Sequence, residues 1–203
     1  MSTDNLRRNI QRCVLVTVAC LATSSAFAQR GAMTVPQNLD ELTDRAQDVV
    51  RGTVVSAHVE KHPELTNLHT VVVTLRVGET LKGATRDRYT FRQYIWDVRD
   101  RYDAAGYRKG QELLLLMNGP SRYGLTSPVG IEQGRFRIQR DRSGRAVALN
   151  GTGNVRLFDR LQDPPGKPAA LTPRQASVVA KHRQGPVALG ELAGMIRAYA
   201  RND

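Results

Sequence analysis

Two long stretches of alternating residues constrain the fold of this chain more than any other feature. β-branched residues dominate both 48–62 and 68–81, and the side chains in each follow a period of two. Residues 63–67, which begin with a proline, separate the two stretches. This pattern predicts two strands joined as a hairpin. Each stretch has 12 residues or more, and strands of that length usually bend or coil, as they do in small barrels.

Shorter strands follow this hairpin. The run LLLLM within Glu112–Met117 is continuously apolar and lies between Gly110 and the turn residues Asn118–Pro120. Such a run predicts a strand that is buried on both sides, with alternate leucines on opposite faces. The remaining predicted strands cover 88–96, 134–139, 145–149 and 154–158, and the middle two form a hairpin around Asp141–Gly144.

Helical patterns flank the strands. Asn38 followed by Glu41 gives the capping-box pattern and predicts a helix over 39–46. The Thr-Pro pair at 172–173 opens a second helix, and the apolar spacing of 189–200 predicts a terminal amphipathic one. Strands come first and helices last, without alternating βαβ units, so we expect an antiparallel sheet.

The first 28 residues have the pattern of a secretory signal. Three arginines precede the apolar run Cys13–Leu21, which is too short to span a bilayer, and Ala26-Phe27-Ala28 offers small residues to a signal peptidase. We therefore expect cleavage between Ala28 and Gln29 and a secreted or periplasmic protein, with no transmembrane segment in the mature chain. A lipoprotein anchored through Cys20 is a weaker alternative, because Thr17 stands where such signals have a leucine-like residue.

The predicted cleavage removes both cysteines, Cys13 and Cys20. The mature chain is then expected to have no disulfide, no thiol nucleophile and no cysteine-bound zinc. The remaining 175 of 203 residues are enough to bury a core. The predicted organisation is a signal peptide at 1–28, a flexible lead-in at 29–37, a β-barrel domain at 38–158, a proline-rich linker at 159–172 and a C-terminal helical tail at 173–203.

The positive charge does not by itself indicate nucleic-acid binding. The formal charge of the chain is +11, and the segment 1–28 carries +2 of it, which leaves +9. The cations are scattered singly and aromatic residues make up only 5% of the chain. Tyr89 and Phe91 alternate onto one strand face and Tyr94 and Trp96 onto the other, so at most half of them can form a stacking platform. We predict no nucleic-acid partner. Phe91 and Trp96 are expected to fill the core.

Four short markers within 48–158 resemble a known group of proteins. They are Gly52, Leu81-Lys82-Gly83, the strand entry Gly110-x-Glu112 and the segment Gln133-Gly134-Arg135-Phe136. Together they resemble uncharacterised exported bacterial proteins with an OB-like barrel, which is similar to the netrin-like domain of tissue metalloprotease inhibitors. The resemblance implies a mainly β fold: an antiparallel OB-like Greek-key barrel with a short N-terminal helix and C-terminal helices.

The resemblance implies a fold and an exported location but no reaction, because the group has no established activity. The metalloprotease inhibitors chelate the protease zinc through an N-terminal cysteine, whereas the predicted mature chain begins at Gln29. That mechanism therefore does not carry over. A protease-binding, inhibitor-like module stays open as an alternative.

Three histidines are the only candidates for a metal site. His58 and His62 are four residues apart on one strand face, and His69 sits across the predicted hairpin. Imidazoles suit zinc or copper, but Glu60 is the only carboxylate on that face between them. We interpret them as solvated histidines at strand ends and predict neither a metal nor a cofactor.

An enzyme is the main alternative to a binding module. Ser127 lies in an exposed loop, but no G-x-S-x-G elbow surrounds it, and His182 lies in the distant tail. Asp97, Asp100 and Asp103 are interleaved with arginines that would neutralise them. We therefore predict no catalytic residue, and a hydrolase or metal-dependent enzyme that uses polar loop residues remains the alternative.

Two polar loops, 97–109 and 118–130, flank the leucine-rich strand and are predicted to carry the function. The first is expected to be mobile. Tyrosine and arginine contribute strongly to binding at interfaces. Tyr102, Tyr107, Arg122 and Tyr123 are therefore expected to form one partner-binding surface. The expected partner is an unidentified protein or polysaccharide of the cell envelope, and no oligomeric state is predicted.

Overall fold

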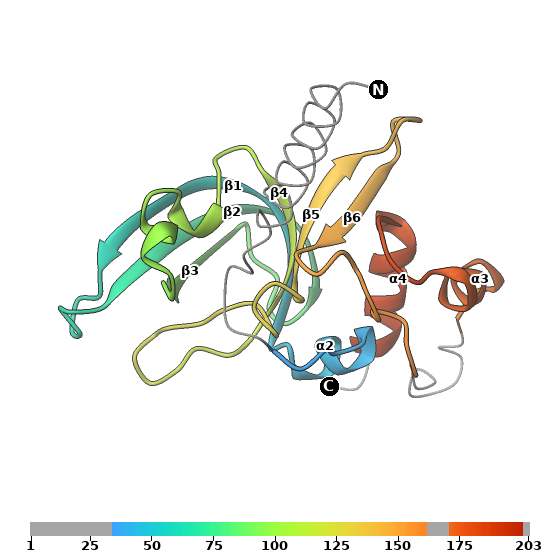
Figure 1. Cartoon of the computed structure of the whole chain (residues 1–203), viewed down its shortest axis with the longest axis horizontal. Helices are drawn as coiled ribbons and strands as arrows, with labels where there is room; N and C mark the ends of the chain where they lie inside the picture. Colours follow the sequence, from blue (N-terminus) through green and yellow to red (C-terminus); the bar gives the residue numbers. More distant parts are fainter. Residues whose placement is uncertain (1–33, 162–170, 201–203) are drawn as a thin grey trace, which may run out of the picture. The chain divides into compact units, whose positions relative to one another are not determined.

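The computed structural model describes residues 34–161 and 171–200. Within them, seven strands form one antiparallel sheet in the order β3-β2-β1-β4-β5-β6-β7 (Figure 1). The strands are β1 (Asp48–Lys61), β2 (His69–Lys82), β3 (Arg88–Tyr94), β4 (Glu112–Met117), β5 (Arg135–Arg140), β6 (Ala146–Asn150) and β7 (Val187–Ala188). The helices are α2 (Leu39–Arg45), α3 (Pro173–Lys181) and α4 (Leu189–Tyr199), with short 3-10 helices η2 (Val98–Arg101) and η3 (Ala104–Gly106). The predicted mainly β, antiparallel fold is confirmed at this level.

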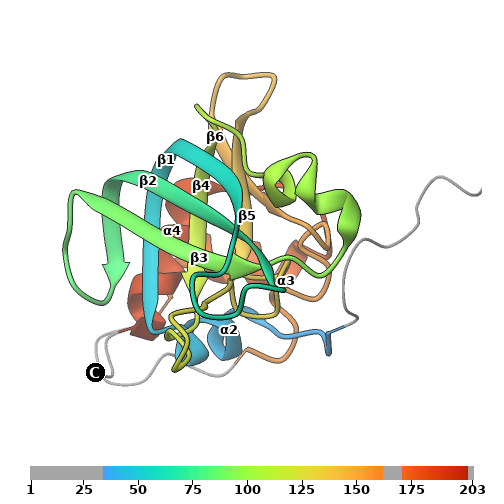
Figure 2. The same cartoon turned by 90° about the vertical axis from the view of Figure 1, so that its left-hand side faces the viewer.

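The β1–β2 hairpin bends strongly, as its length predicts. Its register shifts at three points, next to Val49, Gly52 and Val54, and bulges of this kind increase bending and twist. At one of them the two backbones approach so closely that a Cβ on Gly52 would lie 2.5 Å from the carbonyl oxygen of Arg76. In Figure 2 β1, β2 and β3 lie toward the viewer, with α4 behind them.

The leucine-rich strand β4 separates two hydrophobic cores. Leu114 and Leu116 point into a helix-side core, which also holds Leu39 and Leu42 of α2, Phe136 of β5 and Leu192, Met195 and Ile196 of α4. Leu113, Leu115 and Met117 point into an inner core, enclosed by β1, β2, β3 and Tyr107. All five residues are fully buried. The prediction that this strand is buried on both sides is therefore confirmed.

The helices follow their predicted caps. Asn38 accepts a hydrogen bond from the backbone of Glu41, and the Glu41 side chain accepts one from the Asn38 backbone, so α2 begins with the predicted capping box. Thr172 and Gln175 make the same arrangement at α3. Within the predicted tail 173–203, α4 buries its apolar face in the helix-side core.

The predicted closure into a barrel is not confirmed. β3 and β7 are the two ends of the strand order, so the sheet of the described residues is open. Isolated bridges join Arg92 of β3 to Leu125 and Met117 of β4 to Pro128. The chain between those bridges therefore lies between β3 and β4 without forming a regular strand. Pro120 and Pro128 lack the backbone N–H that a regular ladder needs.

One further prediction needs correction at the end of the sheet, and one strand there was not predicted. The predicted strand at 154–158 is a series of turns. Asn154 and Arg156 both have positive φ, which an extended strand does not allow. The short strand β7, which the sequence did not indicate, takes the place beside β6 through the pair Ala148 and Val187.

Several predictions concern residues outside the described part of the chain. These are the signal peptide at 1–28, the lipoprotein alternative through Cys20, most of the lead-in and residues 162–170 of the linker. Among the described residues, none of the helices combines the length and apolar character needed to cross a bilayer.

Candidate partner-binding surface

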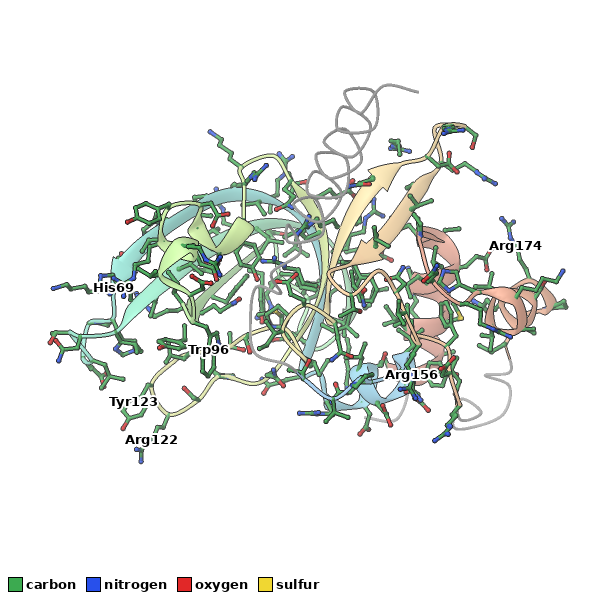
Figure 3. All side chains as sticks on the ribbon, viewed as in Figure 1. His69, Trp96, Arg122, Tyr123, Arg156 and Arg174 are labelled. Atoms are coloured by element: carbon green, nitrogen blue, oxygen red, sulfur yellow. The ribbon has the colours of Figure 1, made fainter. Side chains whose placement is uncertain are left out.

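Three segments come together at the turn between β1 and β2. His62, at the start of this turn, bonds through Nε2 to the carbonyl oxygen of Tyr123, 2.9 Å away. At the other end of the turn, the backbone N–H of Ile95 donates to the carbonyl of His69 at 3.2 Å. We call residues 118–128 the arm. The turn therefore contacts both the segment that follows β3 and the tip of the arm. Figure 3 shows Trp96, Arg122 and Tyr123 at this end of the molecule.

His62 has a structural role that uses both ring nitrogens. Its side chain is buried, with 2% exposed. Nδ1 accepts from the backbone N–H groups of Glu64 and Leu65, at 3.2 and 3.0 Å. Nε2 therefore carries the proton and donates it to Tyr123. The imidazole ties the arm to the turn, and no nitrogen is left to bind a metal.

The other two histidines do not join His62. His58 lies on the exposed face and contacts Glu60 at 3.2 Å, while Arg92 bonds the same carboxylate at 2.6 Å. The hydrogen bond from Arg92 is the main reason that the pKa of Glu60 is lowered. Nδ1 of His69 is buried without a hydrogen-bond partner. The described residues contain no group of three histidine, cysteine, aspartate or glutamate residues that could hold a metal ion.

Exposed large apolar side chains are concentrated after β3. The described residues expose five of them, namely Val35, Trp96, Val98, Tyr102 and Val155. Three of the five lie between 96 and 102, where Trp96 is 63% and Tyr102 is 88% exposed. The ring of Trp96 packs edge-on against Tyr94, with centroids 4.8 Å apart and planes at 78°. This contact holds the indole in one orientation while most of it faces solvent.

The tip of the arm adds an ordered pair of side chains. The guanidinium of Arg122 lies over the ring of Tyr123, 4.6 Å from its centroid, and Nη2 donates to the Tyr123 hydroxyl at 2.6 Å. The tip is a tight turn in which Gly124 N–H donates to the Ser121 carbonyl at 2.9 Å. The Ser121 hydroxyl also accepts from Leu125 N–H at 3.2 Å. These bonds hold the two side chains in a defined arrangement.

The aspartates of the loop 97–109 are structural. Asp97 caps η2 by accepting from Arg99 N–H at 2.9 Å, and its carboxylate bonds the Arg99 guanidinium. Those hydrogen bonds raise the pKa of Arg99. Asp103 caps η3 through Gly106 N–H. Capped 3-10 turns therefore occupy the loop, and its mobility stays a prediction.

Tyr107 does not lie on the predicted surface. Only 2% of it is exposed, and its hydroxyl donates to Oε1 of Gln93 at 2.9 Å inside the inner core. Arg135 stacks over its ring at 4.6 Å and also donates to the carbonyl of Ala105 at 2.8 Å. Burial is the main reason that the pKa of Tyr107 is raised. Tyr107 anchors the loop, so it is separated from Tyr102, Arg122 and Tyr123.

The polar residues weighed for hydrolysis lie apart. The carbonyl of Ser127 accepts from the N–H of Asn118 at 3.0 Å and so closes the base of the arm. His182 bonds the carbonyl of Gly185 at 3.0 Å and packs edge-on against Phe158. The structure therefore gives these two residues separate structural contacts.

A second group of carboxylates lines a cavity of about 450 Å³ on β1 and β2. Arg51 binds Glu112 at 2.7 Å and lies 3.8 Å from Glu79. Arg197 of α4 also binds Glu79. Both carboxylates are thus engaged by arginines, and the group links α4 to the sheet.

Sequence reasoning did not identify Trp96 and Val98 as exposed residues of the candidate surface. The prediction that Phe91 and Trp96 both fill the core holds for Phe91, which is buried, and is wrong for Trp96. The alternation along β3 carries the missing signal. Phe91 lies in the inner core, and Tyr94, three positions later, lies on the opposite face with Trp96 packed against it.

Comparison of the chain with protein-family models, with curated proteins and with solved structures found no match.

Proposed function

We propose that this chain is an exported binding module that contacts a protein of the cell envelope through one end of its sheet. The contact area, here called the loop-end surface, consists of Trp96, Val98, Tyr102, Arg122 and Tyr123. The observation that carries the proposal is the concentration of three exposed large apolar side chains within 96–102. Tryptophan, tyrosine and arginine are the residues enriched at binding hot spots, and contiguous exposed apolar patches mark interaction sites.

A protein suits this surface better than a polysaccharide. A flat sugar ring stacks best on flat, coplanar aromatic faces, and the rings of Tyr94 and Trp96 stand at 78° to one another. Val98 adds an aliphatic group to the same segment. The irregular, mixed apolar and cationic surface favours a folded partner that offers apolar and acidic side chains.

The proposal includes an OB-like barrel and export. The bent β1–β2 hairpin, the inner core and the bridges at Leu125 and Pro128 support a barrel that is closed by the arm. The order of charged, apolar and small residues in 1–28 supports export. The proposal assigns no catalytic step to the chain.

A capture experiment with envelope extract tests this function. The immobilised mature protein is compared with a variant carrying Trp96→Ala, Tyr102→Ala, Arg122→Ala and Tyr123→Ala. A matched control carries Val35→Ala, Val155→Ala, Arg156→Ala and Arg174→Ala, which change exposed residues elsewhere. We expect the control and the wild type to capture the same protein and the first variant to lose it at an unchanged melting temperature. Undiminished capture by the first variant would refute the proposal.

A further inference from the structure

The edge of the sheet at β3 has a defined set of outward-facing backbone groups. β2 and β3 pair without any register shift. The N–H of Val77 donates to the carbonyl of Asp87 at 2.9 Å, and the N–H of Ile95 donates to the carbonyl of His69 at 3.2 Å. Odd-numbered residues of this strand therefore bond to β2, because bonding alternates along an antiparallel pair. The N–H and C=O groups of the even-numbered residues 88, 90 and 92 point away from β2.

The arm covers only one end of this edge. The N–H of Thr126 donates to the carbonyl of Arg92 at 2.9 Å. Towards the start of β3 the arm leaves a cavity of about 390 Å³, lined by β3, by the ion pair of Arg86 with Asp48 and by Pro120, Gly124 and Thr126 of the arm. No hydrogen bond from the described part of the chain reaches the outward-facing backbone of Arg88 or Thr90.

The uncovered part of the edge carries unneutralised positive charge. Arg76 of β2 and Arg88 of β3 are directly opposite one another and exposed. Neither has an acidic partner among residues 34–161 and 171–200, whereas Arg86 binds Asp48 and Arg92 binds Glu60. Like charges directly opposite in a sheet are destabilising. An acidic side chain at the next position across the edge would relieve this repulsion.

The same charges disfavour a second copy of the chain as the occupant. Antiparallel pairing of two β3 strands around Thr90 would place Arg88 of each copy opposite Arg92 of the other. Edge cations of this kind oppose self-association of sheets. The edge therefore favours a foreign strand with acidic side chains over self-pairing.

We propose that the β3 edge binds an extended acidic peptide segment of a partner protein by strand addition. The peptide backbone pairs with the N–H and C=O groups of Arg88 and Thr90, and an acidic side chain lies next to Arg88, one strand away from Arg76. Strand addition takes its affinity from main-chain bonds and its specificity from alternate side chains. This proposal does not depend on the function proposed for the loop-end surface.

A designed peptide tests the proposal on the mature protein. The probe is a labelled, acetylated and amidated peptide, Thr-Val-Glu-Val-Glu-Val-Thr. The first control peptide has Lys in place of Glu, and the second has N-methylated Glu, which removes backbone donors. We expect the acidic probe to slow hydrogen exchange of the Arg88 and Thr90 amides. Roughly tenfold weaker binding is expected for the Lys peptide, because the favourable cross-strand contact with Arg88 becomes repulsive. No binding is expected for the N-methylated peptide.

Variants at Thr90 test the same backbone hydrogen bonds by changing the protein instead of the peptide. Thr90→Pro removes an N–H that β2 does not use, and proline is tolerated at such an edge position. Thr90→Ala keeps this N–H and is the matched control. We expect Thr90→Pro to lose the probe and Thr90→Ala to retain it. If Thr90→Pro does not fold, the N-methylated peptide tests the same hydrogen bond.

Two results would overturn the proposal. The first is unchanged exchange of the Arg88 and Thr90 amides at saturating concentrations of the acidic probe. The second is protection of these amides that rises with protein concentration in the absence of any peptide, which would identify a second copy as the occupant.

Discussion

Large apolar side chains are buried in the helix-side core and exposed at the loop end. On the helix side, α2 and α4 cover the sheet, and Leu192, Met195 and Ile196 are fully buried. At the loop end only the short 3-10 helices η2 and η3 follow β3, and Trp96 and Tyr102 face solvent. Both regions are held by specific contacts, because caps and a buried histidine order the loop end. The difference therefore separates a region built for stability from a surface available for binding.

The two faces of β4 should be equally costly to weaken. Leu114→Ala opens a cavity in the helix-side core and Leu115→Ala opens one in the inner core, and each is expected to cost about 2–5 kcal/mol of unfolding free energy. Denaturant titration of both variants measures this. If either change left the unfolding free energy unaltered, that core would not be closely packed.

Two nearby histidines, His58 on β1 and His62 in the turn that follows β1, are expected to contribute differently to stability. His62→Ala leaves two backbone donors and one carbonyl without their partner, so we expect a loss of about 1–3 kcal/mol. His58→Ala changes an exposed residue and should stay within about 0.5 kcal/mol of the wild type. Thermal unfolding of the two variants gives the comparison. Equal effects would show that His62 does not anchor the arm.

Two tyrosines of the loop 97–109 allow the same comparison between a buried and an exposed side chain. Tyr107→Phe removes a hydroxyl and leaves Oε1 of Gln93 without its donor, so we expect a loss of about 1 kcal/mol or somewhat more. Tyr102→Phe, at an exposed ring, should change stability by less than about 0.5 kcal/mol. Urea titrations of both variants would contradict this if Tyr102→Phe proved the more damaging.

The smallest expected effect on stability comes from Asp141, which lies in the hairpin between β5 and β6. The hydrogen bond from the Ser143 hydroxyl, at 2.6 Å, is the main cause that lowers the pKa of Asp141 to about 2. Backbone N–H groups of Ser143 and Arg145 contribute as well. Because the folded pKa is depressed, the stability from this contact is present above the ordinary aspartate pKa and is lost as the pH falls towards 2.

The carboxyl titration of Asp141 is measurable by NMR. Ser143→Ala should move its pKa up towards the ordinary value, and Arg142→Ala is the matched neighbouring control, which should leave it in place. A pKa of Asp141 that does not respond to Ser143→Ala would assign the depression to the backbone donors instead.

Local patterns predicted much of the fold, because their causes are local. The capping box at Asn38 and Glu41 and the apolar run of β4 each specify their own structure within a few residues. The closure of the sheet depends on contacts between distant segments, such as Arg92 with Leu125, which no local pattern records. The position of α4 in the helix-side core likewise depends on contacts between residues that are far apart in the sequence.

The candidate surface was predicted only in part for a related reason. Residue type identified Tyr102 and the pair Arg122 and Tyr123, all of which lie in the loops. Residue type alone could not distinguish Tyr107, which turns inward to Gln93, from Tyr102, which does not. The strand phase would have separated Trp96 from Phe91, since tertiary packing covers only one face at the end of β3.

Site-specific photo-crosslinking in exporting cells tests the central claim most directly. A benzoylphenylalanine placed at position 102 is compared with one at position 155, since both native side chains are exposed and only the first belongs to the loop-end surface. We predict a discrete adduct with an envelope protein from position 102 and none from position 155. An adduct from position 155 with none from position 102 would contradict the account, because the binding surface would then lie away from the loop end.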